Sequence, residues 1–296
     1  MEQFFANFKI PFTTQQLNES VALAKQQAGE LIGDINVLKK IFGCIDLTSL
    51  NTSDSAFSIR GFCERVNRFP AQFPSMPQVA AVCVYPVFAP VLKVSLTAKE
   101  VKKAVVAAGF PSSQAFTDIK VMEARKSVDF GVDEIDVVIS VGEFLDENYE
   151  FILEEIRMIK DAIGDTHLKV ILETGLLPDA SAIWRASLLA MEGGANFIKT
   201  STGKSPVSAT PEAAYVMLNA IDSFFKVTGK KVGFKPAGGI VTPVDAAIYY
   251  ALVKNILGDE WLPSDWFRIG ASRLANNLLT DISSIESGSK LEVAYF

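Results

Sequence analysis

The chain reads Ala195-Asn196-Phe197-Ile198-Lys199-Thr200-Ser201-Thr202-Gly203-Lys204 from residue 195 to residue 204. Its apolar start is typical of a strand that is buried in a parallel sheet. Such a strand rarely ends in an ammonium group, because lysine is almost never buried without a partner. A second apolar run ends in the same way, in Val232-Gly233-Phe234-Lys235. The two lysines therefore mark strand ends that have a chemical role.

Short apolar runs of the same kind recur from residue 43 onward, and longer segments separate them. The eight candidate strands lie at residues 43–47, 80–85, 103–108, 134–139, 168–173, 196–200, 232–235 and 267–271. Between them, residues 148–163 place apolar side chains at helical spacing. Thr210-Pro211 and Thr242-Pro243 are typical helix starts, and they predict helices over residues 212–225 and 244–257.

This alternation predicts an α/β fold, a (β/α)8 TIM barrel, because eight buried parallel strands joined by crossover helices close into a barrel. A doubly wound open sheet is the alternative, but no Gly-x-Gly-x-x-Gly motif follows the first strand. Residues 43–296 would form the catalytic barrel with a C-terminal tail. Residues 1–42 would form an N-terminal helical extension packed on the barrel. Its helix, which residues 13–16 lead into and which runs through about residue 31, would cap the barrel bottom.

Composition disfavours several classes of protein. The formal net charge is −6, whereas nucleic acid and anionic membrane select for basic surfaces. We expect no signal peptide, because residues 1–8 lack a basic region followed by a continuous apolar stretch. We expect no membrane span, because the longest apolar run, residues 79–92, is short and contains Pro86 and Pro90. The three cysteines lack metal-ligand spacing. We therefore expect a cytoplasmic protein without a metal site, and assembly into a homo-oligomer is compatible with the sequence.

Polar residues gather at the candidate strand ends, where barrel enzymes build their active sites. They are Asp46, Asp136, Lys169, Glu173, Lys199 and Lys235. Separate structural ion pairs are the alternative explanation, but three lysines on neighbouring buried strands favour catalysis. A buried amine beside another cation loses its proton more easily and can attack a carbonyl. Lys199 and Lys235 therefore indicate Schiff-base chemistry.

Three further residues have two interpretations each. Asp136 is a candidate proton shuttle, or a carboxylate that only neutralises Lys169. Cys83, at the end of the second strand, either faces the site or is a small buried apolar residue. His167, the only histidine, precedes the fifth strand at the opposite end, so histidine triads and histidine-rich metal sites are excluded.

A phosphate site is predicted from the glycines that follow the last three strands. The loops after strands 7 and 8 of a barrel, together with a helix N-terminus, commonly hold phosphate. Glycine lets backbone N–H groups approach the oxygens, and a lysine adds a cation. The candidates are Gly203, Lys204, Gly238, Gly239, Gly270 and Ser272.

With these residues, the chain resembles the deoxyribose-phosphate aldolase family of class I aldolases from about residue 45 to residue 279. The resemblance is most specific in residues 46–50, 134–138, 197–204 and 233–239, and it extends to residues 83–86 and 168–175. These enzymes interconvert 2-deoxy-D-ribose 5-phosphate with D-glyceraldehyde 3-phosphate and acetaldehyde. The resemblance thus implies a sugar phosphate and an aldehyde as small-molecule partners, and no cofactor.

The resemblance also implies a role for each candidate residue. Lys199 would form the Schiff base, Lys235 would lower its pKa, and Asp136 would relay protons through water with the help of Lys169. Asp46 would contact a substrate hydroxyl, and Thr202 would help to order the site. The substrate-binding set implied in this way is Asp46, Thr202, Cys83 and the penultimate residue Tyr295.

Two residues depart from the family pattern. Many relatives have arginine at the position of Val241 and a small residue at the position of Arg273. We expect Val241 to weaken phosphate binding unless Arg273 replaces the missing cation from the adjacent loop. Two other functions remain open: another Schiff-base aldolase or transaldolase of a related sugar phosphate, and a catalytically silent sugar-phosphate-binding barrel.

Overall fold

A computed structural model describes residues 1–296, and it confirms a barrel of eight parallel strands. The strands are β1 (Ile45–Thr48), β2 (Ala81–Val84), β3 (Lys102–Ala107), β4 (Glu134–Val138), β5 (His167–Ile171), β6 (Phe197–Lys199), β7 (Gly233–Lys235) and β8 (Ile269–Ala271). They pair in the order β7-β6-β5-β4-β3-β2-β1-β8. Two parallel bridges, Phe234 with Phe267 and Ala237 with Gly270, complete the circle between β7 and β8. The doubly wound alternative is therefore wrong.

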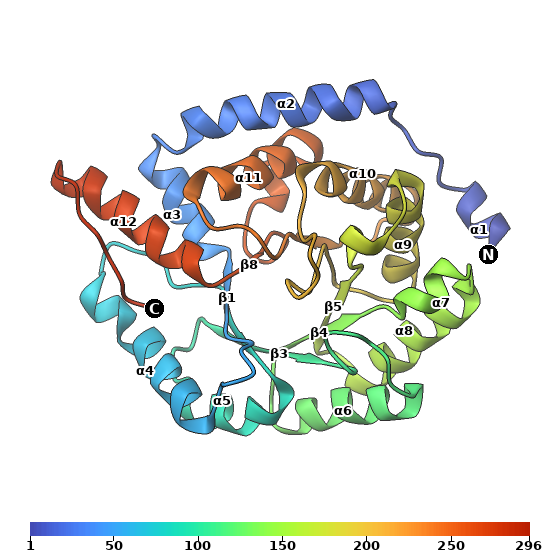
Figure 1. The fold of residues 1–296 in the computed structure, drawn as a ribbon, viewed down its shortest axis with the longest axis horizontal. Coiled ribbons are helices and arrows are strands. Elements are labelled where there is room, and N and C mark those ends of the chain that lie inside the picture. The colour runs from blue at the N-terminus through green and yellow to red at the C-terminus, as the bar shows by residue number, and fades with distance from the viewer.

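Helices surround the strands and form an outer ring (Figure 1). They are α1 (Glu2–Ala6), α2 (Thr14–Leu31), α3 (Ile35–Gly43), α4 (Ala56–Gln72), α5 (Ala89–Ser95), α6 (Thr117–Asp129), α7 (Val141–Leu145), α8 (Tyr149–Ile163), α9 (Ala180–Glu192), α10 (Pro211–Thr228), α11 (Pro243–Leu257) and α12 (Arg273–Ser287). The two predicted Thr-Pro starts are confirmed, because Thr210 and Thr242 cap α10 and α11 with their side chains. Short 3₁₀ turns cover Pro86–Phe88, Thr174–Leu176 and Asp259–Trp261.

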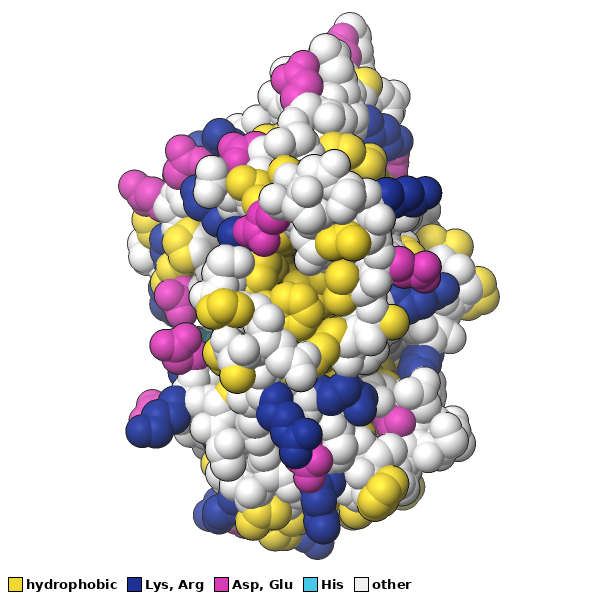
Figure 2. Space-filling model, turned by 90° about the vertical axis from the view of Figure 1, so that its left-hand side faces the viewer, with side chains coloured by type: hydrophobic (Ala, Val, Ile, Leu, Met, Phe, Trp, Pro, Cys, Tyr) yellow, Lys and Arg dark blue, Asp and Glu magenta, His cyan; other side chains and the backbone are white.

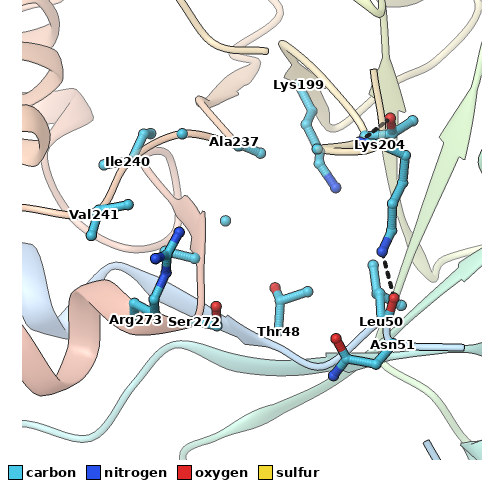
Figure 3. Close-up of a pocket in the computed structure, with 16 residues that line it drawn as sticks. Thr48, Leu50, Asn51, Lys199, Lys204, Ala237, Ile240, Val241, Ser272 and Arg273 are labelled. Atoms are coloured by element: carbon cyan, nitrogen blue, oxygen red, sulfur yellow. Dashed lines mark hydrogen bonds between the residues drawn. The ribbon is translucent and has the colours of Figure 1, made fainter. Parts of the chain in front are cut away.

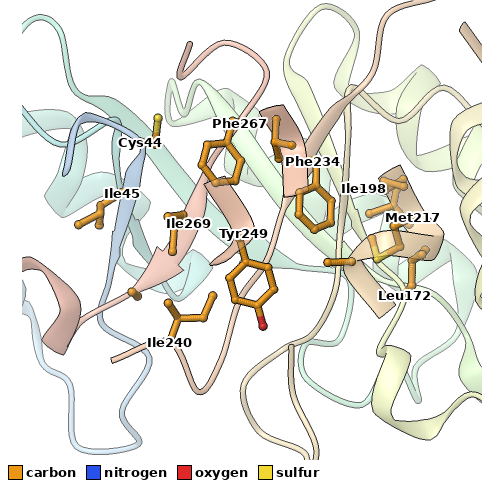
Figure 4. Packing of buried hydrophobic residues seen from close by; sticks show 14 of the residues in the cluster. Cys44, Ile45, Leu172, Ile198, Met217, Phe234, Ile240, Tyr249, Phe267 and Ile269 are labelled. Carbon is orange, nitrogen blue, oxygen red and sulfur yellow. The ribbon is translucent and has the colours of Figure 1, made fainter. Parts of the chain in front are cut away.

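The two faces of the strands carry different residues. Outward-facing aliphatic residues such as Val82 and Ile135 join the helices in a core of 80 buried apolar residues. Figure 4 shows this layer around β7 and β8, where Phe234, Phe267 and Ile269 lie. Inside the barrel, β2 and β3 contribute a separate small apolar cluster of Leu50, Ala81, Cys83, Ala104 and Val106. These short side chains leave room for long charged ones from the other strands.

The N-terminal extension does not cap the bottom of the barrel, so that prediction is wrong. Its longest helix, α2, lies on the outside of α10 and α11 (Figure 1). The buried residues of α2 are Leu17, Val21, Ala24 and Ala28, which form one stripe at helical spacing. The two alanines let α2 approach the helical ring closely, and α11 buries apolar residues on almost every side. The extension therefore adds a second helical layer to the wall.

The C-terminal tail returns along α12 and ends against α4. The rings of Tyr295 and Phe296 pack on Phe69, with centroids 5.6 and 5.3 Å away. Asn276 of α12 fixes the tail by accepting from the backbone N–H of both tail residues, at 3.0 and 2.9 Å. Figure 2 views this side of the molecule and shows apolar side chains gathered in a hollow. The tail thus belongs to the helical layer.

Candidate active site

Three lysines surround one carboxylate inside the barrel. Asp136 Oδ2 accepts from Lys199 Nζ at 2.8 Å and from Lys235 Nζ at 2.7 Å, and its Oδ1 accepts from Lys169 Nζ at 3.1 Å. Asp136, Lys169 and Lys235 are fully buried, and Lys199 is 4% exposed. Two ammonium groups that share one oxygen disfavour each other's charged form. The structure therefore brings all four predicted catalytic residues together.

The prediction that all the polar residues end their strands is wrong for three of them. Lys199 and Lys235 are the last residues of β6 and β7, but Asp46, Asp136 and Lys169 lie inside β1, β4 and β5. The strand register explains the difference. Lys169 pairs with Phe197, two residues before Lys199, so it starts lower in the barrel and reaches upward. The site therefore has two levels, with Lys199 on the upper one.

Arg268 and Glu134 form the lower level together with Asp46, and the sequence analysis did not single out the first two. Arg268 donates to Glu134 through both terminal nitrogens, at 3.1 and 2.8 Å, and to Asp46 Oδ1 at 2.7 Å. Glu134 also binds Lys169, and Asp46 Oδ2 lies 2.5 Å from Lys235 Nζ. The sequence does contain a sign of their role, because both are charged residues within apolar runs that are predicted to be buried strands.

The surroundings move the pKa values of the three lysines in different directions. Burial, reinforced by Lys235, lowers the pKa of Lys199 despite the attraction of Asp136. Burial also opposes the charged forms of Lys235 and Lys169, but the carboxylates around them raise both pKa values. The three lysines hold the pKa of Asp136 well below its usual range, although burial opposes this. Lys199 is therefore the lysine most ready to lose its proton.

A cavity of about 230 Å³ opens above Lys199 (Figure 3). Of the network residues, only Lys199 lines it. All six predicted phosphate-binding residues line it as well, namely Gly203, Lys204, Gly238, Gly239, Gly270 and Ser272. Thr202, Thr48 and Asn51 complete its polar wall. The Lys199 amine and the predicted phosphate-binding residues thus face one small cavity.

Local backbone geometry builds the loops of this cavity. Gly238 has φ +83°, and a Cβ there would lie 2.6 Å from Ser208, so the turn after β7 requires glycine. Glu173, after β5, accepts from the Thr202 hydroxyl at 2.5 Å, and that hydroxyl accepts from the Lys204 backbone N–H at 3.0 Å. Lys204 Nζ reaches across to the Leu50 carbonyl at 2.6 Å. Thr202 therefore links the end of β5 to the loop that follows β6.

Three predicted substrate-binding residues do not line the cavity. Asp46 is fully buried in the lower level, where Arg268 and Lys235 bind it. Cys83 faces the barrel interior beneath the cavity, and burial raises the pKa of its thiol to about 11. The Tyr295 hydroxyl donates to the Arg65 carbonyl at 2.7 Å, outside the barrel. Contacts with residues far away in the chain, which the sequence does not show, keep these three side chains out of the cavity wall.

Both departures from the family pattern lie in the cavity wall. Val241 follows the glycine turn after β7, and Arg273 is the first residue of α12. Figure 3 shows the Arg273 side chain reaching toward Val241. The arginine is thus placed where it faces the gap left by the valine.

No group of three or more histidine, cysteine and carboxylate side chains in the structure is arranged to hold a metal. None of the helices is long and apolar enough to cross a membrane.

Comparison with known proteins gives a consistent result. Residues 41–259 match the family described as DeoC/LacD family aldolase. The chain is 42% identical to the deoxyribose-phosphate aldolases of Bos taurus, over 80% of this chain and 78% of that protein, and of Homo sapiens, over 81% and 79%. A deoxyribose phosphate aldolase structure from Aeropyrum pernix has the same fold, with a TM-score of 0.65 and 24% identity over 89% of this chain and 97% of that one. This chain belongs to the DeoC/LacD family of aldolases.

Proposed function

We propose that this chain is a class I aldolase that reversibly cleaves 2-deoxy-D-ribose 5-phosphate to D-glyceraldehyde 3-phosphate and acetaldehyde. One observation carries the proposal. Lys199 is the only network lysine in the cavity wall, and the anion-binding loops lie in the same wall. The lowered pKa of Lys199 leaves its amine free to attack, because the other two lysines keep their protons.

The network residues suit each step of such a reaction. The Lys199 amine adds to the substrate carbonyl, and loss of water gives an iminium. The C2–C3 bond then breaks as the C3 hydroxyl loses its proton, and the bonding electrons pass into the iminium to form an enamine. C3 becomes the aldehyde carbon of D-glyceraldehyde 3-phosphate, which leaves. Protonation of the enamine carbon and hydrolysis release acetaldehyde and regenerate Lys199. Asp136, held by Lys169 and Lys235, would relay protons through water, because its low pKa lets it hold a proton only transiently.

The phosphate group would lie against the loops after β6, β7 and β8. Backbone N–H groups at Gly238 and Gly239, the N-terminus of α12 and the Lys204 ammonium group would bind its oxygens. Arg273 would supply the cation that Val241 does not. Lys204 would have to release the Leu50 carbonyl, which requires only rotation of a long side chain. This arrangement supports a sugar phosphate rather than a free sugar as substrate.

Trapping the Schiff base tests the proposal. The protein is incubated with acetaldehyde, reduced with borohydride and analysed by peptide mass spectrometry. We expect an ethyl group on Lys199 and none on Lys204, which lies in the same cavity but outside the network. Lys204 thus serves as an internal control for non-specific alkylation. Folded protein without an adduct on Lys199 would exclude acetaldehyde as the donor, and a screen of ketose donors would then test the related aldolases.

The cysteines and a related structure bear on the cellular setting and the assembly of the chain. All three cysteines are free and buried, which fits a reducing cytoplasm. The deoxyribose phosphate aldolase of Aeropyrum pernix is described as tetrameric, and we expect this chain to form a homo-oligomer too. Sedimentation of the purified chain would give its assembly state.

A further inference from the structure

The pair formed by Glu134 and Arg268 lies in the barrel interior but does not reach the cavity. Its contacts with the upper level run through Asp46, which Arg268 binds, and Lys169, which Glu134 binds. Arg268 also lies 5.6 Å from the Phe197 ring centroid, and that ring covers Gly233. Both residues are almost completely buried, at 2% and 3% exposed. No step of the reaction needs them to touch substrate.

The ion-pair network of the interior contains more basic groups than acidic ones. The other buried carboxylate there, Glu173, forms no ion pair and accepts from the Thr202 hydroxyl. Three carboxylates, Asp46, Glu134 and Asp136, face four basic groups, Lys169, Lys199, Lys235 and Arg268. A buried charge without a partner is costly, so an enclosed cluster favours equal numbers of opposite charges. One basic group is then expected to be neutral. Arg268 cannot be that group, because a guanidinium keeps its proton in proteins.

Contacts decide which amine is neutral. Lys169 lies within 4.0 Å of three carboxylates and Lys235 within that distance of two. Lys199 has one carboxylate partner, Asp136, and shares its oxygen with Lys235. The other titratable groups near Lys199 are Cys83 of β2 on the inner side and, in the cavity wall, Lys204 and Arg273. Glu173, after β5, is also buried, but its carboxylate accepts from Thr202 and forms no ion pair. Asp136 is therefore the only carboxylate paired with Lys199.

We propose that Arg268, held by Glu134, is a positioning residue whose fixed positive charge completes the set that leaves Lys199 as the neutral amine. This inference rests on the proposed function, since it assigns the control of the Schiff-base lysine. It gives the lower level a chemical purpose that a purely structural ion pair would lack. Adding or removing one charge in the lower level must therefore change the pH at which Lys199, in the upper level, loses its proton.

Single and double substitutions of the pair test this inference. Arg268→Met removes a positive charge and raises the pKa of Lys199, so the acidic limb of kcat/KM moves up by about one pH unit. Below that limb, activity falls about tenfold at a given pH. Glu134→Gln removes a negative charge, so the acidic limb of kcat/KM should shift to lower pH. The double variant restores the excess of one basic group, so its limb returns to the wild-type position.

A matched control is available outside the barrel interior. Lys120 and Glu155 form a buried pair between α6 and α8, with Nζ and Oε1 2.8 Å apart. Glu155→Gln should lower the free energy of unfolding and leave the pH profile unchanged. If the pair of Glu134 and Arg268 were only structural, its variants would behave like this control. Limbs that stay in place in folded Glu134→Gln and Arg268→Met proteins would overturn the inference.

A second measurement separates this inference from the proposed function. The rate at which acetic anhydride acetylates Lys199, followed by mass spectrometry against pH, reports the protonation of that amine without any turnover. A wild-type protein without aldolase activity would contradict the proposed function, whereas unshifted acetylation profiles would contradict the role of Arg268. If Arg268→Met does not fold, the isosteric Glu134→Gln decides alone, and its profile must move to lower pH.

Discussion

The outward and inward faces of the barrel strands differ in the side chains that they bury. The outward face joins the helices in one apolar core of 80 buried residues. The inward face holds seven interlocked charged residues beside a small apolar cluster of five. Many barrels of this fold fill the interior with branched aliphatic layers instead. Stability is thus expected to come mainly from the outer layer, and reactivity from the interior.

The difference has a physical reason. Burial of apolar surface stabilises the folded state wherever it occurs. The attraction within a buried ion pair does little more than offset the free energy lost when the two charges leave water. A charged interior is therefore a poor source of stability but an effective means of shifting pKa values. If this division holds, substitutions inside the barrel should change activity with little effect on stability, and substitutions in the outer layer should do the reverse.

The largest effect is expected at Lys199. Lys199→Met removes the nucleophile, so aldolase turnover should fall by about 10⁴-fold or more, as assays of acetaldehyde release would show. Unfolding in urea should be almost unchanged, because methionine fills the same space without a charge. Lys204→Met is the matched control, and it should raise KM for the sugar phosphate while keeping kcat. Substantial turnover in Lys199→Met would refute the assignment of the nucleophile.

The next effect concerns the outer layer. Phe69 is fully buried and its ring packs on Phe42, Phe73 and the tail. Phe69→Ala should lower the free energy of unfolding by about 3–5 kcal/mol, because the cavity cannot collapse completely. The position of the acidic limb of kcat/KM should not move. A displaced limb would mean that the two faces are coupled, contrary to the division proposed here.

A smaller effect is expected in the loop that links the two faces. Gly238→Ala places a methyl group against Ser208 at a residue with φ +83°. The turn must shift, so KM for the phosphorylated substrate should rise about tenfold to a hundredfold. Gly229→Ala is the control, since Gly229 also has positive φ but has open space around it and lies away from the cavity. An equal rise in KM for both variants would argue against a phosphate site at Gly238.

The smallest effect is expected at the tail. Deletion of Tyr295 and Phe296 removes two aromatic rings that are only partly buried, so stability should fall by about 1 kcal/mol. In this structure the Tyr295 hydroxyl binds the Arg65 carbonyl, far from the cavity wall. We therefore expect kcat and KM to be unchanged. A large loss of kcat would restore the substrate-binding role that the resemblance implied for Tyr295.

The sequence by itself determined the order and number of the strands. Short β-rich runs and Thr-Pro helix starts are local signals, and the eight strands and the capped helices α10 and α11 follow them closely. Lys199 and Lys235 were also visible, because an apolar strand that ends in lysine is unusual. The phosphate loops were predictable for a similar reason, since glycine follows three successive strands.

Only the tertiary structure decided how these residues meet. The stagger of the strands sets Lys169 below Lys199, and the closure of the barrel brings Arg268 against Asp46 and Glu134. The stacking of α2 on α10 and α11, rather than on the barrel bottom, likewise depends on which apolar surfaces remain uncovered. Such outcomes rest on contacts between residues far apart in the chain. Periodicity and caps report local backbone preference, whereas the level and partner of a buried charge depend on the packing of the whole barrel.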